Sequence, residues 1–201
     1  MAFPTPREAI AFSILHWEGE WQNDPADSGN YAHAFDGTTR LVGTMRGVTP
    51  DAYAANRRTE RPSYTQVGAG GTGHLEAVRV VFDPSKVSYE RLLEVFWHNV
   101  DPLDAGGQFC DRGETYRTAV FVHGAGQRRS AEASKAALEA EDRRRGAIAT
   151  EIRDAGPFWP AEDYHQDYYR KNPARYRFYR WNCGRDARLR EVWGPGAAGG
   201  H

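Results

Sequence analysis

The chain has 201 residues and a formal net charge of −1, so its size suits one substantial domain with an appendage. Because its charges nearly balance, no overall field draws it to nucleic acid, and no such partner is expected. Its two cysteines, Cys110 and Cys183, form no Cys-x-x-Cys pair and no His/Cys cluster, which argues against a metal site.

The apolar run 10–15 near the N-terminus is too short to cross a membrane. No basic region or small-residue cleavage site frames it, so we expect a cytoplasmic protein with no membrane partner. The two cysteines then have three interpretations: inert core thiols, a structural disulfide or a redox pair.

Residues 5–20 are predicted to form an amphipathic helix. Thr5 suits the N-cap, and Ile10, Ile14 and Trp17 fall on one stripe at helical spacing. The turn-rich stretch NDPADSGN that follows is predicted to be a loop.

This helix, followed by HWEG at 16–19 and NDPAD at 23–27, resembles the start of phage-type muramidases. The segment 40–57 follows the same family loosely. The resemblance implies a muramidase-like segment 1–57 and an alternative activity, peptidoglycan hydrolysis, in which Glu18 is the catalytic acid. A glutamate after a helix is otherwise an ordinary solvated acid.

The stretch 70–84, GGTGHLEAVRVVFDP, is predicted to form the central strand, after a polar, turn-rich junction at 56–71. Glu76 shares parity with Val78, Val80 and Phe82, so these four side chains lie on one face. The opposite face is also largely apolar, which predicts a sheet covered on both sides. A carboxyl against an apolar wall is expected to have a raised pKa and to donate a proton, unless it pairs with an arginine or caps the turn.

The middle of the chain alternates helices and strands. Ser88 is predicted to cap a helix to about Asn99, and 100–117 follows as a long loop of the kind that carries function. A strand is predicted at 116–122, with Tyr116 at its start, as Glu76 is at the start of the central strand. If these two strand ends are adjacent, they bring a phenol and a carboxyl together. The remaining elements predicted here are a solvated helix at 127–145 and a third strand at 147–153.

The C-terminal part is rich in aromatic residues, which are predicted to wrap over the sheet with His165 hydrogen-bonded inside. Glu162 and His165 stand three apart, a spacing that ligates iron in helical bundles, but a single copy argues against iron. Arginines alternate with aromatic residues over 170–190, a pattern that can bind single-stranded nucleic acid, although acidic residues dilute it here. A flexible tail is predicted at 195–201.

Most of the chain, from about residue 61 to 194, resembles peptide methionine sulfoxide reductase A. The segments that carry the resemblance are PSYTQV (62–67), GGTGHLEAVRVVFDPSKVSYERLLEVFW (70–97), DPLDAGGQFCDRGETYRTAVFV (101–122), TEIRDAGPFWPAEDYHQDYYRKNP (150–173) and YRFYRWNCGRDARLREVWG (176–194). The predicted fold class is α+β: a mixed sheet with covering helices and a long aromatic C-terminal wrap, plus an N-terminal helical segment. The predicted domains are 1–57 and 58–194.

The resemblance implies an oxidoreductase that repairs methionine sulfoxide formed under oxidative stress, with thioredoxin or another dithiol as reductant and no resident cofactor. Transferred by motif, it implies Glu76 as the proton donor, Tyr64 and Tyr116 as phenols of the site, and Asp111 as its aspartate. The same transfer makes Cys183 the resolving thiol. We expect a monomer.

The chain departs from this family at the nucleophile. The family's cysteine lies in a Gly-Cys-Phe-Trp segment upstream of the motif with Tyr64, and no cysteine precedes Cys110 here. Cys110 is the candidate substitute, but the adjacent Asp111 raises the pKa of a thiol unless Arg112 offsets its charge. The alternative is a chimera that binds methionine sulfoxide without reducing it.

Overall fold

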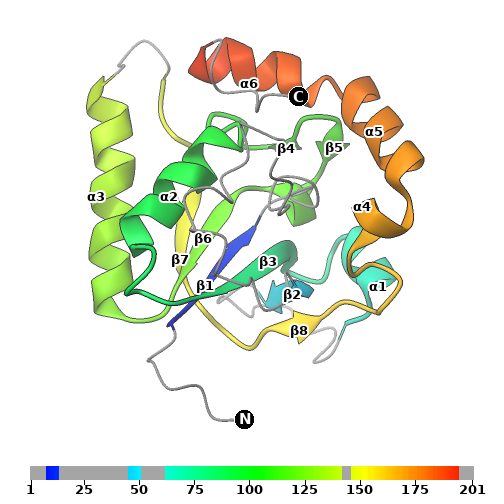
Figure 1. Ribbon diagram of the computed structural model, residues 1–201, viewed down its shortest axis with the longest axis horizontal. Coiled ribbons are helices and arrows are strands. Elements are labelled where there is room, and N and C mark those ends of the chain that lie inside the picture. The colour runs from blue at the N-terminus through cyan, green and yellow to red at the C-terminus, as the bar shows by residue number, and fades with distance from the viewer. Residues whose placement is uncertain (1–7, 14–44, 51–61, 142–145, 195–201) are drawn as a thin grey trace.

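The computed structural model describes residues 8–13, 45–50, 62–141 and 146–194. Within these residues, six strands form one mixed sheet in the order β7-β6-β1-β3-β2-β8, flanked by helices, which confirms the α+β fold class (Figure 1). β6 and β7 pair in parallel, and the other neighbours pair antiparallel. A separate hairpin of two short strands, β4 and β5, lies in the region predicted as a long loop.

The helix predicted at 5–20 is wrong where the structure describes it, because β1 spans Glu8–Ser13 as a strand. β1 hydrogen bonds on both edges: Ile10 is opposite Val80 of β3, and Phe12 is opposite Val120 of β6. A short apolar run does not by itself distinguish a helix from a strand. Here β3 and β6 both pair with this run, and the hydrogen bonds to these two neighbours favour the strand. Glu18 and the HWEG and NDPAD motifs lie outside the described residues, and of the segment 40–57 only β2, Met45–Pro50, is described.

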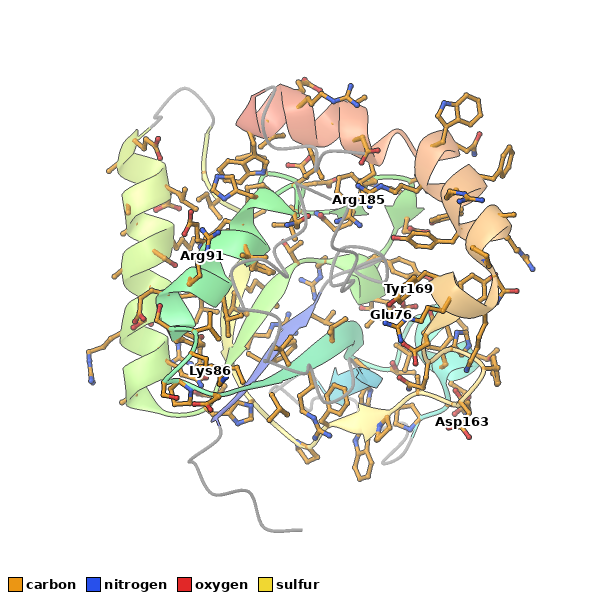
Figure 2. All side chains as sticks on the ribbon, in the orientation of Figure 1. Glu76, Lys86, Arg91, Asp163, Tyr169 and Arg185 are labelled. Atoms are coloured by element: carbon orange, nitrogen blue, oxygen red, sulfur yellow. A yellow bond between two sulfur atoms is a disulfide. The ribbon has the colours of Figure 1, made fainter. Side chains whose placement is uncertain are left out.

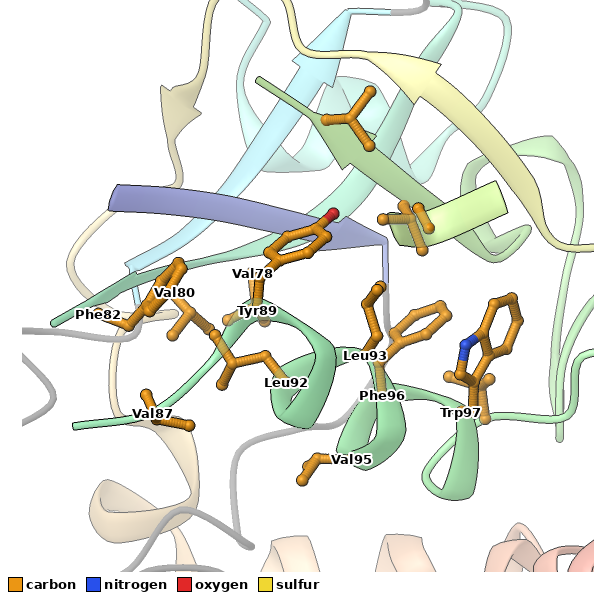
Figure 3. Close-up of a cluster of buried hydrophobic side chains, with 14 of the residues drawn as sticks. Val78, Val80, Phe82, Val87, Tyr89, Leu92, Leu93, Val95, Phe96 and Trp97 are labelled. Carbon is orange, nitrogen blue, oxygen red and sulfur yellow. The ribbon is translucent and has the colours of Figure 1, made fainter. Parts of the chain in front are cut away.

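β3, His74–Phe82, confirms the predicted central strand and its two faces. Val78, Val80 and Phe82 pack with α2, Tyr89–His98, in the main hydrophobic core (Figure 3). From the opposite face, Leu75 packs into a smaller buried cluster with side chains of β6. Both faces of β3 are therefore covered, as the apolar pattern on each face predicted.

Two helices lie along the same side of the sheet (Figure 1). Ser88 caps α2 by accepting a hydrogen bond from the Arg91 N–H, as predicted. α3, Ala125–Glu141, lies beside α2, and the Trp97 indole donates to Ser134 across the contact at 3.0 Å. The two helices thereby close the main core from one face.

Several predicted boundaries are wrong. The junction at 56–71 contains a helix, α1, Tyr64–Gly68. The strand predicted at 116–122 is β6, Ala119–Val122, and the strand predicted at 147–153 is β7, Glu151–Asp154. β3 and β6 are not adjacent, because β1 lies between them. Both are antiparallel to β1, so both strands begin at the same end of the sheet.

The aromatic wrap predicted at the C-terminus contains three helices. The remaining elements are β2 (Met45–Pro50), β4 (Gly107–Gln108), β5 (Asp111–Arg112), the 3₁₀ turn η2 (Glu114–Tyr116), β8 (Trp159–Pro160), α4 (Tyr168–Lys171), α5 (Pro173–Asn182) and α6 (Arg185–Trp193). In Figure 1 the three helices form an arc along one margin of the molecule. No helix in the described part of the chain has the length and apolar character needed to span a membrane.

Buried contacts fix α6 to the loop that follows α2. The Arg188 guanidinium donates to the buried carboxylate of Asp101 at 2.6 Å. Arg185 is itself buried and donates to the Asn99 carbonyl, and the Trp193 indole donates to the Val100 carbonyl at 2.9 Å. α6 is thus tied to the segment that leads into the β4–β5 hairpin.

Candidate active site

Glu76 is the third residue of β3, and its side chain is 5% exposed. The Tyr64 hydroxyl donates a hydrogen bond to Glu76 Oε2 at 2.7 Å. A buried carboxyl thus lies at the start of an apolar strand with a phenol on it, as the sequence predicted. Figure 2 shows Glu76 at the side of the sheet that faces α1 and α4.

The short helix α1 brings Tyr64 to this carboxyl. Ser63 and Gln66 form a capping box, in which the Ser63 hydroxyl accepts from the Gln66 N–H and the Gln66 side chain accepts from the Ser63 N–H. The chain then reverses through Gly70 and Gly71, both at positive φ, into β3. The Gly71 N–H donates to Glu114 at 2.5 Å, which links this turn to η2.

Two residues of the C-terminal segment also contact Tyr64. The Tyr64 N–H lies 3.3 Å from both carboxylate oxygens of Glu162. The His165 ring stacks on the Tyr64 ring, with centroids 3.6 Å apart and planes 27° apart. The Glu162–His165 spacing therefore serves to position a phenol, which gives no support to the iron interpretation. The spacing of these two residues is visible in the sequence, but nothing local links Glu162 to Tyr64, which lies 98 positions away.

Replacing His165 by alanine is expected to lower the free energy of unfolding by about 1 kcal/mol, because the stack on Tyr64 is lost. His165→Phe keeps a ring at this position and is expected to restore most of the loss. Urea unfolding of the three proteins measures both effects. Equal losses in the two variants would show that the ring stack contributes nothing.

Tyr116 lies at the end of η2, beside α1, and not on a strand as predicted. A Cβ atom built on Gly68 would lie 3.8 Å from the Tyr116 hydroxyl, so the phenol approaches the helix that carries Tyr64. Burial raises the pKa of Tyr116, and the negative charges of Glu76 and Asp111 raise it further. Tyr116 therefore lies in the field of both carboxylates, which come from different parts of the chain.

Cys110 and Cys183 form a disulfide, which decides among the three interpretations left open by the sequence in favour of a bonded pair. Cys110 lies in the tight turn between β4 and β5, and Cys183 is the C-cap of α5. The region predicted as a loop therefore presents a sulfur on a short hairpin. Cys110 is exposed and Cys183 is half-buried, so the disulfide lies near the surface.

Tyr179 joins this disulfide to Asp111, and the sequence did not predict its role. Its hydroxyl donates a short hydrogen bond to Asp111 Oδ2 and lies 3.2 Å from Cys110 Sγ. Burial raises the pKa of Tyr179 well above its usual value, and the hydrogen bond to Asp111 adds to the increase. Tyr179 lies four residues before Cys183 on a predicted aromatic segment, and that helical spacing was the signal that could have found it.

Arg112 does not offset Asp111 in the way the sequence suggested. Its guanidinium forms an ion pair and a hydrogen bond with Asp104 across the hairpin. The same contact raises the pKa of Arg112, while Arg112 and the Gly106 N–H outweigh burial and lower the pKa of Asp104. The negatively charged carboxylate of Asp111, next to Cys110, therefore receives a hydrogen bond from the Tyr179 phenol and is not paired with Arg112.

The site thus combines two groups that share one electrostatic environment. One is a buried carboxyl with a phenol on it, Glu76 and Tyr64, which suits proton donation. The other is a pair of bonded sulfurs beside Asp111 and Tyr179, which suits two-electron exchange. Tyr116 lies in the field of the carboxylates of both groups.

Comparison with known proteins agrees with this chemistry. Residues 32–196 match the model of the family described as peptide methionine sulfoxide reductase. The protein named peptide methionine sulfoxide reductase MsrA of Bacillus licheniformis is 52% identical over 136 residues, which is 68% of this chain and 75% of that protein. Its namesake in Bacillus subtilis is 49% identical over 136 residues, 68% of this chain and 77% of that protein.

Solved structures show the same fold. Methionine sulfoxide reductase A of Corynebacterium diphtheriae superposes with a TM-score of 0.61 at 28% identity, covering 83% of this chain and 76% of that one. The reduced form of Mxr1 from Saccharomyces cerevisiae superposes with a TM-score of 0.67 at 23% identity, covering 87% of this chain and 90% of that one.

The muramidase resemblance of residues 1–57 gains no support from these comparisons. The family match begins at residue 32, inside that segment. The boundary predicted after residue 57 remains a prediction. With the family model covering most of the chain and relatives about half identical over two-thirds of it, the chain belongs to the peptide methionine sulfoxide reductase family.

Proposed function

We propose that this chain reduces methionine sulfoxide, with Glu76 as proton donor, Cys110 as nucleophile and Cys183 as resolving thiol. The observation that carries the proposal is the Cys110–Cys183 disulfide on a hairpin that leads into η2, because η2 in turn contacts β3, the strand that carries Glu76 of the Glu76–Tyr64 pair. A disulfide of this kind is the product that a nucleophile and its resolving thiol leave after one turnover. Family membership supports the reaction class, and the two-cysteine sequence supports the choice of sulfurs.

The proposed reaction balances in three steps. The Cys110 thiolate attacks the sulfoxide sulfur while Glu76 gives a proton to the sulfoxide oxygen; methionine leaves, and Cys110 becomes a sulfenic acid. The Cys183 thiol then attacks the Cys110 sulfur, which releases water and forms the disulfide. A dithiol finally gives two electrons and two protons to the disulfide and restores both thiols.

The polar residues of the site have separate parts in this scheme. Tyr64 holds the Glu76 carboxyl through its hydrogen bond, and we assign it the task of keeping that group aimed at the sulfoxide oxygen. Tyr116 is assigned as a second phenol donor to the same oxygen, since a raised pKa keeps its hydroxyl protonated at neutral pH. Asp111 is assigned to the sulfur half of the site, where it accepts from Tyr179.

The reductant is a dithiol protein of the thioredoxin type, and the chemistry needs no resident metal or cofactor. Cys110 is exposed and Cys183 is partly exposed, which supports access of such a partner to the disulfide. A thiol cycle of this kind operates where thiols are kept reduced, which favours the cytoplasm. We propose that the protein acts as a monomer there.

A single-turnover experiment tests the proposal. The protein is reduced, freed of reductant and mixed with N-acetylmethionine sulfoxide; free thiols, the disulfide and N-acetylmethionine are then measured. We expect one methionine product and one Cys110–Cys183 disulfide per chain. Cys110→Ser is the control and is expected to yield no product.

The alternative is a site that binds the sulfoxide without reducing it. In that case the sulfoxide would bind, as calorimetry detects, while both thiols persisted and no methionine appeared. If wild type and Cys110→Ser formed equal amounts of product, Cys110 would not be the nucleophile.

A further inference from the structure

Tyr179 occupies a place in the sulfur half of the site that no role above accounts for. It lies on α5, and the Cys183 N–H donates to its carbonyl at 2.9 Å, so the phenol and the resolving sulfur are held on one helical turn. From there its hydroxyl reaches across to the β4–β5 hairpin. It lies 3.2 Å from Cys110 Sγ and donates to Asp111.

The hydroxyl lies between two acceptors that compete for its proton. Asp111 Oδ2 lies 3.9 Å from Cys110 Sγ, and a carboxylate this close makes a thiolate on Cys110 less stable. While the disulfide is closed, the sulfur carries no charge, and the hydroxyl donates to Asp111. When the disulfide opens, a negative sulfur forms within hydrogen-bonding distance of the same hydroxyl.

We propose that Tyr179 is a catalytic residue that donates a hydrogen bond to the Cys110 thiolate and thereby makes Cys110 the leaving group when the disulfide is opened. The inference rests on the proposed function for its place in the cycle. The thiolate of a dithiol attacks Cys183 Sγ, the disulfide breaks, and the electron pair stays on Cys110. The second thiol of the dithiol then displaces Cys183, which leaves as a thiol once protonated.

The surroundings of Tyr179 favour a donor and oppose its ionisation. The charged and titratable groups that act on the phenol include Asp111 of β5, Tyr116 of η2 and Glu76 of β3. All of them raise the pKa of Tyr179, as burial does, so the hydroxyl keeps its proton at neutral pH. A phenol that stays protonated can donate a hydrogen bond to a thiolate without transferring its proton to it.

The test measures the pKa of Cys110 directly. Cys183→Ser leaves Cys110 as the one thiol, because the chain has two cysteines. In this background the rate of alkylation by iodoacetamide is followed as a function of pH, with and without Tyr179→Phe. Loss of the hydrogen bond is expected to raise the pKa of Cys110 by about one unit, which is about tenfold less thiolate at neutral pH.

Tyr176→Phe is the matched control, because it removes a hydroxyl from the same helix one turn earlier. It is expected to leave the pKa of Cys110 unchanged. Circular dichroism checks that each variant is folded. An unchanged pKa in Tyr179→Phe, or an equal shift in Tyr176→Phe, would overturn the proposal.

A second measurement uses the unaltered chain and needs no variant to fold. The oxidised protein is exposed briefly to reduced glutathione and quenched with acid, and the glutathione adduct is located by peptide mass spectrometry. The adduct is expected mainly on Cys183, since Cys110 leaves; an adduct mainly on Cys110 would contradict the assignment. Neither measurement contains a sulfoxide, so failure of turnover and failure of this inference are seen separately.

Discussion

Replacing Glu76 by glutamine is expected to lower the rate of methionine sulfoxide reduction by roughly 10²- to 10⁴-fold, the range that general acid catalysis contributes. The amide keeps the size of the side chain. Its oxygen can still accept from the Tyr64 hydroxyl, which donates to the Glu76 carboxyl at 2.7 Å in the unaltered chain. It has no acidic proton to give to the sulfoxide oxygen. The expected loss is therefore one of chemistry, with folding preserved.

Steady-state reduction of N-acetylmethionine sulfoxide with dithiothreitol measures this loss as kcat/KM. Glu94→Gln is the control, because Glu94 lies exposed on α2 and pairs there with Arg91. That variant is expected to retain wild-type activity. If Glu76→Gln kept activity within threefold of wild type, the proton would have to come from another group, and Tyr116 would be the next candidate.

Reducing the Cys110–Cys183 disulfide is expected to lower the free energy of unfolding by about 4 kcal/mol, because the bond closes a loop across a sequence separation of 73 residues. The bond restricts the unfolded chain, and it also ties the β4–β5 hairpin to the end of α5. The contacts of α6 with Asp101, Asn99 and Val100 remain after reduction, so the helix is expected to stay docked.

Urea unfolding with and without a phosphine reductant measures this difference. The double variant Cys110→Ser/Cys183→Ser is the control, and its unfolding midpoint is expected not to respond to the reductant. A midpoint that is the same for oxidised and reduced wild type would show that the disulfide does not stabilise the fold. A change of about 4 kcal/mol means that the protein is markedly less stable at the start of each turnover than at its end.

The sequence predicted the site best where each residue acts through its own local pattern. Glu76 follows from strand parity alone, since a carboxyl in phase with Val78 and Val80 has to share their buried face. The cap of α2 by Ser88 follows in the same way. The sequence also predicts Tyr116 near the carboxyl, but it predicts a strand where the structure has the 3₁₀ turn η2.

The residues that were missed act through partners far away in the chain. Glu162 is separated from Tyr64 by 98 positions, and Tyr179 from Asp111 by 68. No window along the sequence contains both members of either pair. The helix predicted over β1 failed for a related reason, because the strand is selected by hydrogen bonds to β3 and β6 and not by its own residues.

From the sequence alone follow the burial of side chains on the central strand, the start of α2 after Ser88, and the identity of the two sulfurs that the chain can use. The folded chain alone shows that those sulfurs are bonded, that a phenol lies between one of them and Asp111, and that β1 occupies the middle of the sheet. The reason is physical. Burial periodicity and caps depend on neighbours a few residues apart, whereas these contacts depend on where the whole chain folds back on itself.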